Sequence, residues 1–315
     1  MKKKICVIGG GRWGQNHIRT LYQMGNLAAI VVRNPEKLNQ LLEKYHVSGF
    51  SSIDKAISAG FDGYTVVTPA ETHYQIGKKL LENGCHTLIE KPMALSSSET
   101  AELVDIAERN NVNLMVGHLL LFHPAIRKIK EEVESGRIGK LYYIYSNRLN
   151  LGMMKTKENV FWDLAPHDIS IIDYIIGKPC INIKASGVKM LQENIHDTGI
   201  IHLEYPDNIQ AHIFVSWMHP FKEQRLVVVG SKGMISFEDS SKDKKIIFYN
   251  KRIELEEGNP VNYEGPSEFI EYEYSAPLEN ELRYFVEHLD NKVEISDGKS
   301  GHKVIEVLER VQKCF

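Results

Sequence analysis

The sequence predicts an α/β protein of two domains, an N-terminal domain of the Rossmann type and a C-terminal α+β domain with a large, mostly antiparallel open sheet. Three observations lead to this prediction. The chain has 315 residues, whereas one domain usually holds about 100 to 200. Its first third alternates short apolar runs with amphipathic stretches, as in a parallel sheet covered by helices. Later runs are longer and alternate apolar with polar residues, which is typical of antiparallel strands.

Five apolar runs of the first domain are expected to be strands, at residues 5–8, 27–32, 63–67, 86–89 and 113–116. Helices should join them. One is expected to begin at Ser96, because a Ser three residues before Glu99 can form a reciprocal capping box. Another covers residues 72–83 and ends at Gly84, since glycine is a common C-terminal cap.

The second domain should contain strands at residues 141–149, 199–205, 210–215 and 226–229. Residues 205–208 and 230–233 have the Pro, Asn and Gly content of hairpin turns, so neighbouring strands are expected to pair in sequence. Two helices, at 278–289 and 301–314, close the chain. We place the domains at 1–120, for the cofactor, and 121–315, for substrate and oligomerisation, with C-terminal helices free to pack back on the first domain.

Composition excludes several classes of partner. Lys and Arg number 38 against 41 Asp and Glu, a net charge of -3, with no dense basic stretch, so nucleic acid is not an expected partner. No apolar run approaches the roughly 20 residues of a membrane helix. We therefore expect a soluble protein. The four cysteines are widely separated, which favours a reducing cytoplasm over a disulfide framework or a zinc site.

A dinucleotide fingerprint follows the first strand directly. Residues 9–14, GGGRWG, contain G-x-G-x-x-G ahead of a helical stretch that runs to about Met24. Glycines there permit the sharp turn and let the backbone approach a pyrophosphate, while the helix N-terminus offers N–H donors to the anion. The alternative is a glycine-rich turn without a ligand. Its position after a strand in an α/β half favours nucleotide binding.

The end of the second strand bears on the choice of cofactor. An acidic residue usually lies there in NAD-binding folds and bonds the ribose 2′-hydroxyl. This chain has Val32 followed by Arg33, so a 2′-phosphate would meet a cation and no carboxylate. The sequence thus predicts NAD(P) with a lean towards NADP, the alternative being that Arg33 is a solvated surface residue.

Two further segments are candidates for catalysis. Glu90-Lys91-Pro92 follows a strand at the edge where open α/β sheets bind ligands, and the proline holds Lys91 extended. A lysine there can hold a substrate hydroxyl and stabilise a developing alkoxide. Asp163 and His167 are four residues apart, so both lie on one helical face and the carboxylate can orient the imidazole. The alternatives are a surface lysine, a capping aspartate and a packed histidine. No third metal ligand is apparent, and we expect no metal.

Together the motifs resemble the glucose-fructose oxidoreductase and inositol dehydrogenase family (Gfo/Idh/MocA), over the whole chain. The fingerprint, the E-K-P segment, the D-x-x-x-H motif and Thr68-Pro69 with His73 carry this resemblance. It implies chemistry by Lys91, Asp163 and His167. The cofactor-binding residues it implies are Gly9, Gly11, Arg12, Trp13, Gly14, Arg33, Thr68, Pro69, His73, Glu90 and Lys91. The substrate-binding residues are Lys91, His118, Arg148, Asn150, Asp163 and His167, with packing as the alternative for His118 and His123.

The segments at residues 147–152 and 158–163 indicate which branch of this family the chain resembles. Many relatives have a glycine-rich stretch before the catalytic Asp, which this chain lacks. It is similar in this to the branch that oxidises nucleotide-linked sugars at C3, the UDP-N-acetylglucosamine 3-dehydrogenases of amino-sugar and lipopolysaccharide precursor synthesis. Arg148 and Lys155 are candidates to meet the diphosphate, or else ordinary surface cations.

The resemblance implies that the sugar 3-hydroxyl gives its proton to His167, or to Lys91 if burial lowers the pKa of that lysine, as a hydride leaves the same carbon. The labile 3-keto product would pass to a following enzyme, such as an aminotransferase. Alternatives are oxidation or reduction of a free sugar, an inositol or a dihydrodiol, and a non-catalytic NAD(P)-binding regulator. The family also commonly buries one face of the C-terminal sheet between subunits, so we expect a homodimer or homotetramer.

Overall fold

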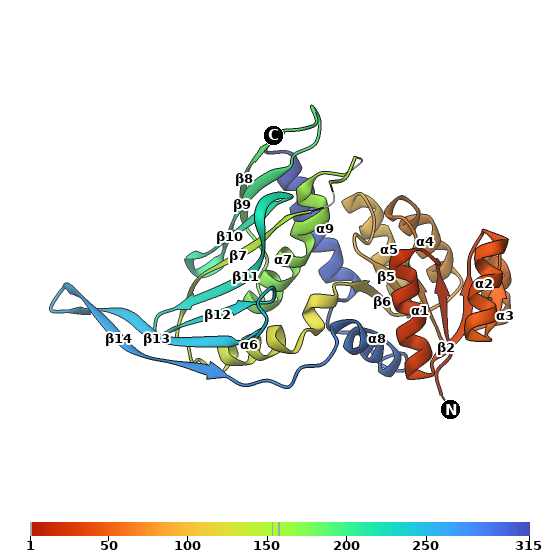
Figure 1. Ribbon diagram of the computed structural model, residues 1–315, viewed down its shortest axis with the longest axis horizontal. Coiled ribbons are helices and arrows are strands. Elements are labelled where there is room, and N and C mark those ends of the chain that lie inside the picture. The colour runs from red at the N-terminus through yellow and green to blue at the C-terminus, as the bar shows by residue number, and fades with distance from the viewer. Residues whose placement is uncertain (1, 153, 157) are drawn as a thin grey trace. The chain divides into compact units, whose positions relative to one another are not determined.

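The computed structural model describes residues 2–152, 154–156 and 158–315, and the chain forms two compact units (Figure 1). The first unit combines residues 1–122 with 275–306, and the second combines residues 123–274 with 307–315. The chain thus first crosses from the first unit to the second after residue 122, close to the boundary placed at residue 120. The segment 275–306, however, belongs to the first unit, so no single boundary divides the chain.

In the described part of the chain, the first unit is a six-stranded parallel sheet in the order β3-β2-β1-β4-β5-β6. This is the Rossmann order, which confirms the predicted fold. Open α/β sheets usually bind ligands at the carboxyl ends of the strands where the order reverses, which are β1 and β4 here. Its strands are β1 (Ile5–Ile8), β2 (Leu27–Val31), β3 (Ser48–Phe50), β4 (Gly63–Val66), β5 (Thr87–Glu90) and β6 (Leu114–Gly117).

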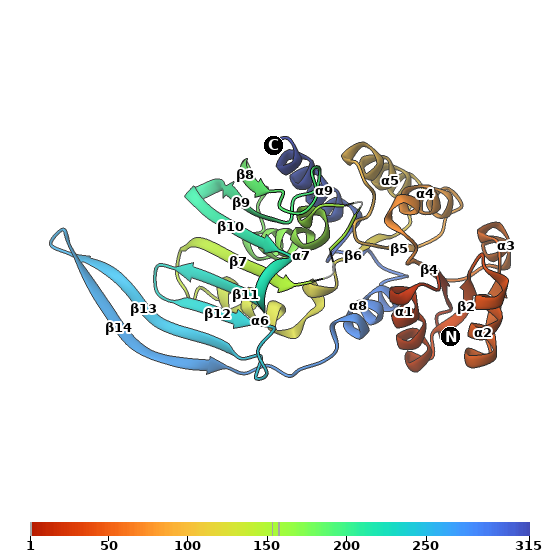
Figure 2. The ribbon, with the colours of Figure 1, turned by 45° about the horizontal axis from the view of Figure 1, so that its top comes forward.

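Helices cover this sheet. Helices α4 and α5 pack side by side, and α1 packs against α8 (Figures 1 and 2). The helices and 3₁₀ turns of the unit are α1 (Arg12–Met24), α2 (Pro35–Tyr45), α3 (Ile53–Ala59), η1 (Ala70–Thr72), α4 (His73–Glu82), α5 (Ser97–Arg109), η2 (Leu119–Phe122) and α8 (Pro277–Glu287). Helix α9 (Gly298–Gln312) contributes residues to both units.

The five predicted strands of this unit are confirmed to within a residue or two, because strands buried on both faces are continuous apolar runs. Strand β3 was not predicted, since only Phe50 of its three residues is apolar. The capping box is half formed. The Ser96 hydroxyl accepts from the Glu99 N–H, but the Glu99 carboxylate reaches the Leu95 N–H instead of that of Ser96.

In the described residues, the second unit is an eight-stranded sheet in the order β14-β13-β12-β11-β7-β10-β9-β8. It is antiparallel apart from the parallel pair β7–β10, so the predicted open sheet is confirmed. Both predicted hairpin turns are present, between β9 and β10 and between β11 and β12. The strands are β7 (Leu141–Leu151), β8 (Asn182–Val188), β9 (Thr198–Tyr205), β10 (Ile209–Ser216), β11 (Met218–Gly230), β12 (Met234–Glu238), β13 (Ile246–Glu256) and β14 (Asn259–Ile270), and η3 (Pro206–Asn208) turns β9 into β10.

Helix α7 (Val160–Ile176) covers one face of this sheet and packs on β7, β9 and β10, while α6 (Pro124–Glu134) packs against α7. The helix ends at Gly177, which adopts φ 69° and whose N–H donates to the Asp173 carbonyl. At the other end Asn159 is the N-cap, since its side chain accepts from the N–H groups of Phe161 and Trp162. Asp163 therefore does not cap the helix.

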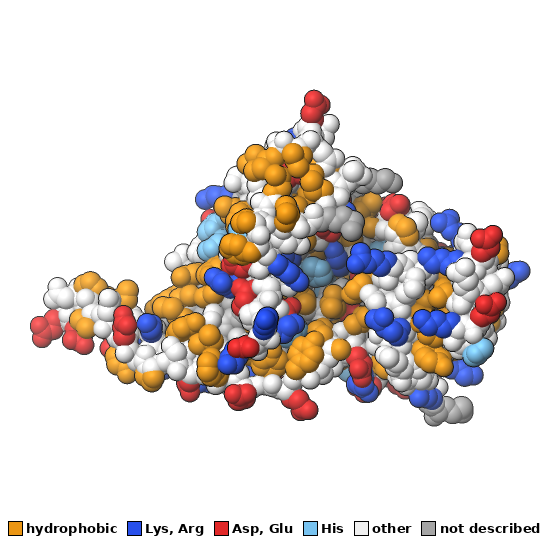
Figure 3. Space-filling model, viewed as in Figure 1, with side chains coloured by type: hydrophobic (Ala, Val, Ile, Leu, Met, Phe, Trp, Pro, Cys, Tyr) orange, Lys and Arg blue, Asp and Glu red, His pale blue; other side chains and the backbone are white. Residues whose placement is uncertain are grey.

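Exposed apolar side chains mark the other face of the sheet and the hairpin β13–β14. Tyr143 and Ile200 are 40% and 48% exposed on β7 and β9. The hairpin extends beyond the remaining strands of its sheet (Figure 2), and apolar side chains gather over it (Figure 3). Its exposed apolar residues are Ile253, Leu255, Val261, Tyr263 and Phe269. No helix among the described residues is both long and apolar enough to cross a membrane.

Candidate cofactor and catalytic site

The glycine loop between β1 and α1 is shaped by close backbone contacts at two of its three fingerprint positions. Gly9 has φ 119°, and a Cβ there would lie 2.5 Å from the Val67 carbonyl oxygen. A Cβ on Gly14 would lie 2.3 Å from the carbonyl oxygen of Gly9. These two glycines therefore let the loop turn and let α1 pack on it.

Gly11 differs, because a Cβ placed on it would meet nothing within 4 Å. Open space thus faces the middle of the loop, where a pyrophosphate approaches the backbone in this fold. Gly11 is the N-cap of α1. Within the described residues, this helix has no side-chain cap hydrogen bond at its N-terminus, and its first turn contains no acidic residue. Free N–H donors at a helix N-terminus suit an anion, so the loop fits a dinucleotide.

At the end of β2, Val32 is buried and Arg33 is exposed. A Cβ on Gly10 would lie 2.8 Å from a Val32 methyl carbon, so Val32 packs under the glycine loop. Asn34 caps α2 by accepting from the Lys37 N–H at 2.9 Å. The Lys37 side chain also approaches the loop, with its Cε 3.6 Å from the Cβ position of Gly10. Contact of Arg33 with a ribose substituent stays a prediction.

His73 joins the loops that follow β4 and β5. Its Nε2 lies 2.8 Å from the Thr68 carbonyl oxygen and its Nδ1 2.8 Å from the Pro92 carbonyl oxygen. The Lys91–Pro92 peptide bond is cis. His73 is 2% exposed, and both of its ring nitrogens lie against carbonyl oxygens of the two loops. Direct contact of His73 with a cofactor stays a prediction.

Glu90 is a buried carboxylate that accepts three hydrogen bonds. The Trp13 indole N–H donates to Oε1 at 2.5 Å, His17 Nε2 lies 2.9 Å from the same oxygen, and the backbone N–H of Lys91 donates to Oε2 at 3.1 Å. Burial alone would raise the pKa of Glu90. Hydrogen bonds from His17 and Trp13 act in the opposite direction, as do the positive charges of protonated His17 and of Lys91. Together they outweigh burial and hold the pKa of Glu90 below its ordinary value.

Gly117 and His118, at the end of β6, also lie close to Glu90. A Cβ on Gly117 would lie 2.8 Å from the Glu90 carboxyl carbon, so only glycine leaves room for that side chain. His118 is 2% exposed, and burial lowers its pKa to about 4. Neither of its ring nitrogens has a hydrogen-bond partner among the described residues. A neutral imidazole with both nitrogens available suits a ligand, and its contact with substrate stays a prediction.

In the second unit, Asp163 and His167 lie one turn apart near the start of α7, as predicted. The Trp217 indole N–H donates to Asp163 Oδ2 at 3.1 Å. The Lys155 ammonium lies 3.8 Å from Asp163 Oδ1 and 3.3 Å from a Glu158 oxygen. Asp163 is thus an oriented carboxylate in the first turn of a helix, where the helix dipole stabilises negative charge.

Arg148 forms a buried, two-pronged ion pair with Asp168, through Nε to Oδ2 at 2.7 Å and Nη2 to Oδ1 at 3.0 Å. The Ser146 hydroxyl also donates to that carboxylate, at 2.6 Å. The guanidinium is therefore engaged within its own unit, and contact with a substrate diphosphate stays a prediction. Asn150 stands two residues farther along β7, and its role stays a prediction as well.

His123 packs instead of facing a ligand. Its ring nitrogen accepts from the Ala125 N–H at 3.1 Å and so caps α6, and its ring contacts those of Phe237, Tyr272 and Tyr274. Of the two roles considered for His123, lining a ligand site or packing, these contacts favour packing.

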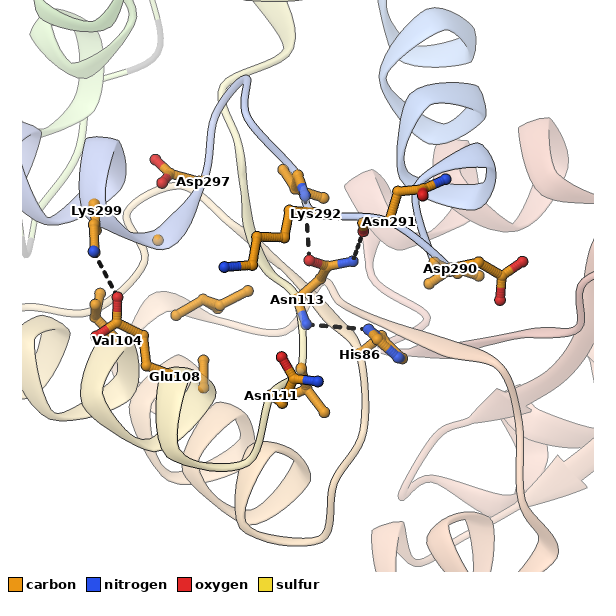
Figure 4. A pocket seen from close by; sticks show the side chains of 16 residues that line it. His86, Val104, Glu108, Asn111, Asn113, Asp290, Asn291, Lys292, Asp297 and Lys299 are labelled. Carbon is orange, nitrogen blue, oxygen red and sulfur yellow. Dashed lines mark hydrogen bonds and ion pairs between the residues drawn. The ribbon is translucent and has the colours of Figure 1, made fainter.

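Figure 4 shows side chains that line a cavity, whose volume is about 780 Å³. His86 and Asn113 line it and directly precede β5 and β6, so the cavity lies at the amino-terminal edge of these strands, opposite the edge that carries Glu90. Asn113 holds its wall together, because its side-chain N–H groups donate to the carbonyl oxygens of His288 and Asn291. Its backbone N–H donates to the His86 ring, and Lys299 pairs with Glu108. These polar groups anchor the returning segment 275–306 to the sheet.

The chain matches two family profiles. Residues 3–118 match an oxidoreductase family with an NAD-binding Rossmann fold, and residues 126–236 match the GFO/IDH/MocA C-terminal domain. The chain belongs to the Gfo/Idh/MocA oxidoreductase family. The glycine loop lies within the part of the chain that matches the NAD-binding Rossmann fold.

Individual members of the family are distant. A UDP-N-acetylglucosamine 3-dehydrogenase of Acidithiobacillus ferrooxidans is 28% identical over 183 residues, which span 58% of this chain and 57% of that relative. An inositol 2-dehydrogenase of Rhizobium meliloti is 22% identical over 319 residues, 96% of this chain and 93% of the relative. The solved structure of the A. ferrooxidans enzyme GnnA covers 100% of this chain and 97% of its own, with a TM-score of 0.87 and 22% identity. That likeness shows the Gfo/Idh/MocA fold.

Some site residues were not predicted. The spacing of His17 could have predicted its place in the site, since it lies four residues after Trp13 and on the face of α1 that also buries Ile18. No sequence pattern predicts Trp217 or Asp168 as site residues. Trp217 contacts Asp163, and Asp168 contacts Arg148, through tertiary packing that sequence spacing does not encode.

Proposed function

We propose that this Gfo/Idh/MocA protein is an NAD(P)-dependent dehydrogenase that oxidises the 3-hydroxyl of a nucleotide-linked sugar, with UDP-N-acetylglucosamine as its first candidate substrate. One observation carries the proposal. Lys91 follows a carboxylate that three donors hold in place at the cofactor edge of the sheet, and the second unit presents Asp163, oriented by Trp217, one turn before His167. A pure binding protein needs no such oriented proton-transfer groups.

Each of these residues has a proposed task. The glycine loop holds the pyrophosphate, and the nicotinamide, when bound, supplies the hydride acceptor for the sugar carbon. His167 takes the hydroxyl proton, Asp163 orients the imidazole, and Lys91 stabilises the negative charge that develops on the sugar oxygen. With Arg33 beside a buried Val32, NADP is the preferred cofactor.

The substrate class rests on resemblance to a 3-dehydrogenase of UDP-N-acetylglucosamine, of which only 57% is aligned. The alternative, oxidation of an inositol or free sugar, has the support of a relative aligned over 93% of its length. A panel of UDP-sugars, free sugars and inositols, each tested with NAD and NADP and with a 2-oxo acid to recycle bound cofactor, separates the two. Nicotinamide reduction by free polyols alone would assign the chain to the alternative, and no reduction by any compound would favour a regulator.

Two further elements belong to the proposal. A 3-keto sugar is chemically labile, so a following enzyme such as an aminotransferase is expected to consume it. The exposed face of the second unit's sheet, which carries Tyr143 and Ile200, is proposed to be covered by a second copy in a homodimer or homotetramer. All four cysteines are free, in keeping with work in the reducing cytoplasm. Light scattering and a Tyr143→Lys variant test the interface.

A further inference from the structure

A second buried carboxylate lies beside the Glu90 network. Glu281 comes from the middle of α8, on the face that also buries Leu282 and Phe285, and it is 0% exposed. One oxygen of Glu281, one of Glu90 and a ring nitrogen of His17 all lie within 4.8 Å of one another. Helices α1 and α8 and the end of β5 thus gather two carboxyl groups and an imidazole inside the first unit.

The two carboxyl groups differ in their partners. Glu90 accepts from Trp13, His17 and Lys91, whereas neither oxygen of Glu281 has a hydrogen-bond partner among the described residues. A buried carboxylate without a donor is strongly unfavourable, and a second negative charge near Glu90 adds repulsion. A neutral acid avoids both penalties and adds an O–H donor, which Glu90 can accept.

We propose that Glu281 is a neutral carboxylic acid that shares its proton with the Glu90 carboxylate and acts as a positioning residue for the Glu90–Lys91 segment. Gly117 closes one side of the Glu90 side chain, and Trp13 and His17 bond another. Glu281 supplies the remaining side, from α8. Only the consequence for turnover rests on the proposed function of Lys91; the protonation of Glu281 does not.

The electrostatics of the pair agree with this arrangement. Burial, and after it the charge of Glu90, raises the pKa of Glu281 well above its ordinary value. The pKa of Glu90 is lowered, so the two groups are driven apart in the manner of two acids that share one proton. The titratable groups around the pair are His17 on α1, Lys91 after β5 and His118 after β6, and η2 contributes only leucines and phenylalanine.

The sign of the pH effect follows from linkage. Between the ordinary value of 4.5 for a glutamic acid and the raised value in the fold, the folded protein binds more protons than the unfolded chain. The contribution of Glu281 to stability is therefore present at low pH and is lost as pH rises through that window. Glu281→Gln keeps the shape and an N–H donor but cannot ionise. It should flatten the fall of stability with rising pH, and above the window it should be at least as stable as the wild type.

Turnover gives the second readout. Glu281→Gln should retain kcat and substrate KM within about twofold, because the amide replaces the acid as donor. Glu281→Ala should lower kcat by about 10-fold or more, with little change in KM, since Glu90 loses a partner of its charged form. Glu279→Gln is the matched control: Glu279 lies on the same helix, has a half-exposed side chain and pairs with Arg283, so this variant should match the wild type in every readout.

Two results would overturn the inference. One is a Glu281→Gln variant with an unchanged slope of stability against pH, which would show that Glu281 does not titrate as proposed. The other is a pair of findings: Glu281→Gln loses as much turnover as Glu281→Ala, and elemental analysis finds one equivalent of divalent metal in the purified wild type. These findings together would make the cluster a cation site. If no sugar is oxidised yet the slope still flattens, the proposed function fails and the protonation of Glu281 stands. Should Glu281→Ala not fold, Glu281→Gln decides alone.

Discussion

The indole N–H of Trp217 donates to Asp163 Oδ2 at 3.1 Å, so a residue between β10 and β11 fixes the carboxylate that stands one turn before His167. Trp217 is 1% exposed, which keeps water from replacing the bond. Orientation of Asp163 thus depends on the sheet as well as on helix α7.

Trp217→Phe should lower kcat by about 10-fold, the loss of one hydrogen bond to a charged group, while cofactor affinity is unchanged. Trp162→Phe is the matched control, because the Trp162 indole bonds Gln312 rather than Asp163. Steady-state kinetics and a cofactor titration of both variants check this. Equal loss in the two variants would mean that the Trp217–Asp163 bond has no role in turnover.

The glycine loop offers a pair of variants that separate folding from binding. Gly14→Ala forces a Cβ against the Gly9 carbonyl, at 2.3 Å, and should cost about 1–3 kcal/mol of stability as well as cofactor affinity. Gly11→Ala places its Cβ in open space, with φ at -63°, so the melting temperature should hold while cofactor binding weakens. Thermal melts with and without cofactor distinguish the two. A Gly11→Ala protein that binds cofactor normally would place the pyrophosphate elsewhere.

Lys91→Ala should keep cofactor affinity and lose turnover by about 10²- to 10³-fold, as for loss of a group that stabilises a developing oxyanion. His167→Gln should instead remove one limb of the pH profile of kcat/KM, because a glutamine cannot accept the proton. Full pH profiles of both variants assign the two tasks. Normal turnover of Lys91→Ala would remove that lysine from the mechanism.

Arg33→Ala should weaken NADP binding by about 10-fold or more, the value of a hydrogen bond to a charged group, and leave NAD binding unaltered. Fluorescence titration of both cofactors checks this. A wild-type protein that clearly prefers NAD would contradict the proposed preference.

Arg148→Met should lower the free energy of unfolding by about 3–5 kcal/mol, because Asp168 would remain as an unpaired buried charge. Denaturant unfolding measures the loss, and the double variant Arg148→Met with Asp168→Leu should recover part of it. A stable single variant with a raised substrate KM would give Arg148 a binding role instead.

The sequence allowed prediction of those features that local patterns encode. The Rossmann strands are continuous apolar runs, and all but β3 were predicted to within a residue or two. Strand β3 escaped prediction because Ser48 and Gly49 lack an apolar pattern. The parallel pairing of β7 with β10 follows from sheet order, which hairpin turns do not specify.

The site was predictable to the same extent. Glu90, Lys91, Asp163 and His167 lie in recognisable motifs, but their partners are set by tertiary packing. Glu281 lies in an apolar stripe of α8, where a lone glutamate reads as a surface residue until its neighbours are known. Trp217 bonds Asp163 across 54 positions of the chain.

An isotope label shows whether the protein removes a hydride from C3 of a nucleotide-linked sugar. The protein would be incubated with NADP or NAD and UDP-N-acetylglucosamine that carries deuterium at C3, and the reduced cofactor analysed by mass spectrometry. We expect the reduced cofactor to carry one deuterium. Reduced cofactor without the label, or none with this sugar while a free polyol is oxidised, would contradict it.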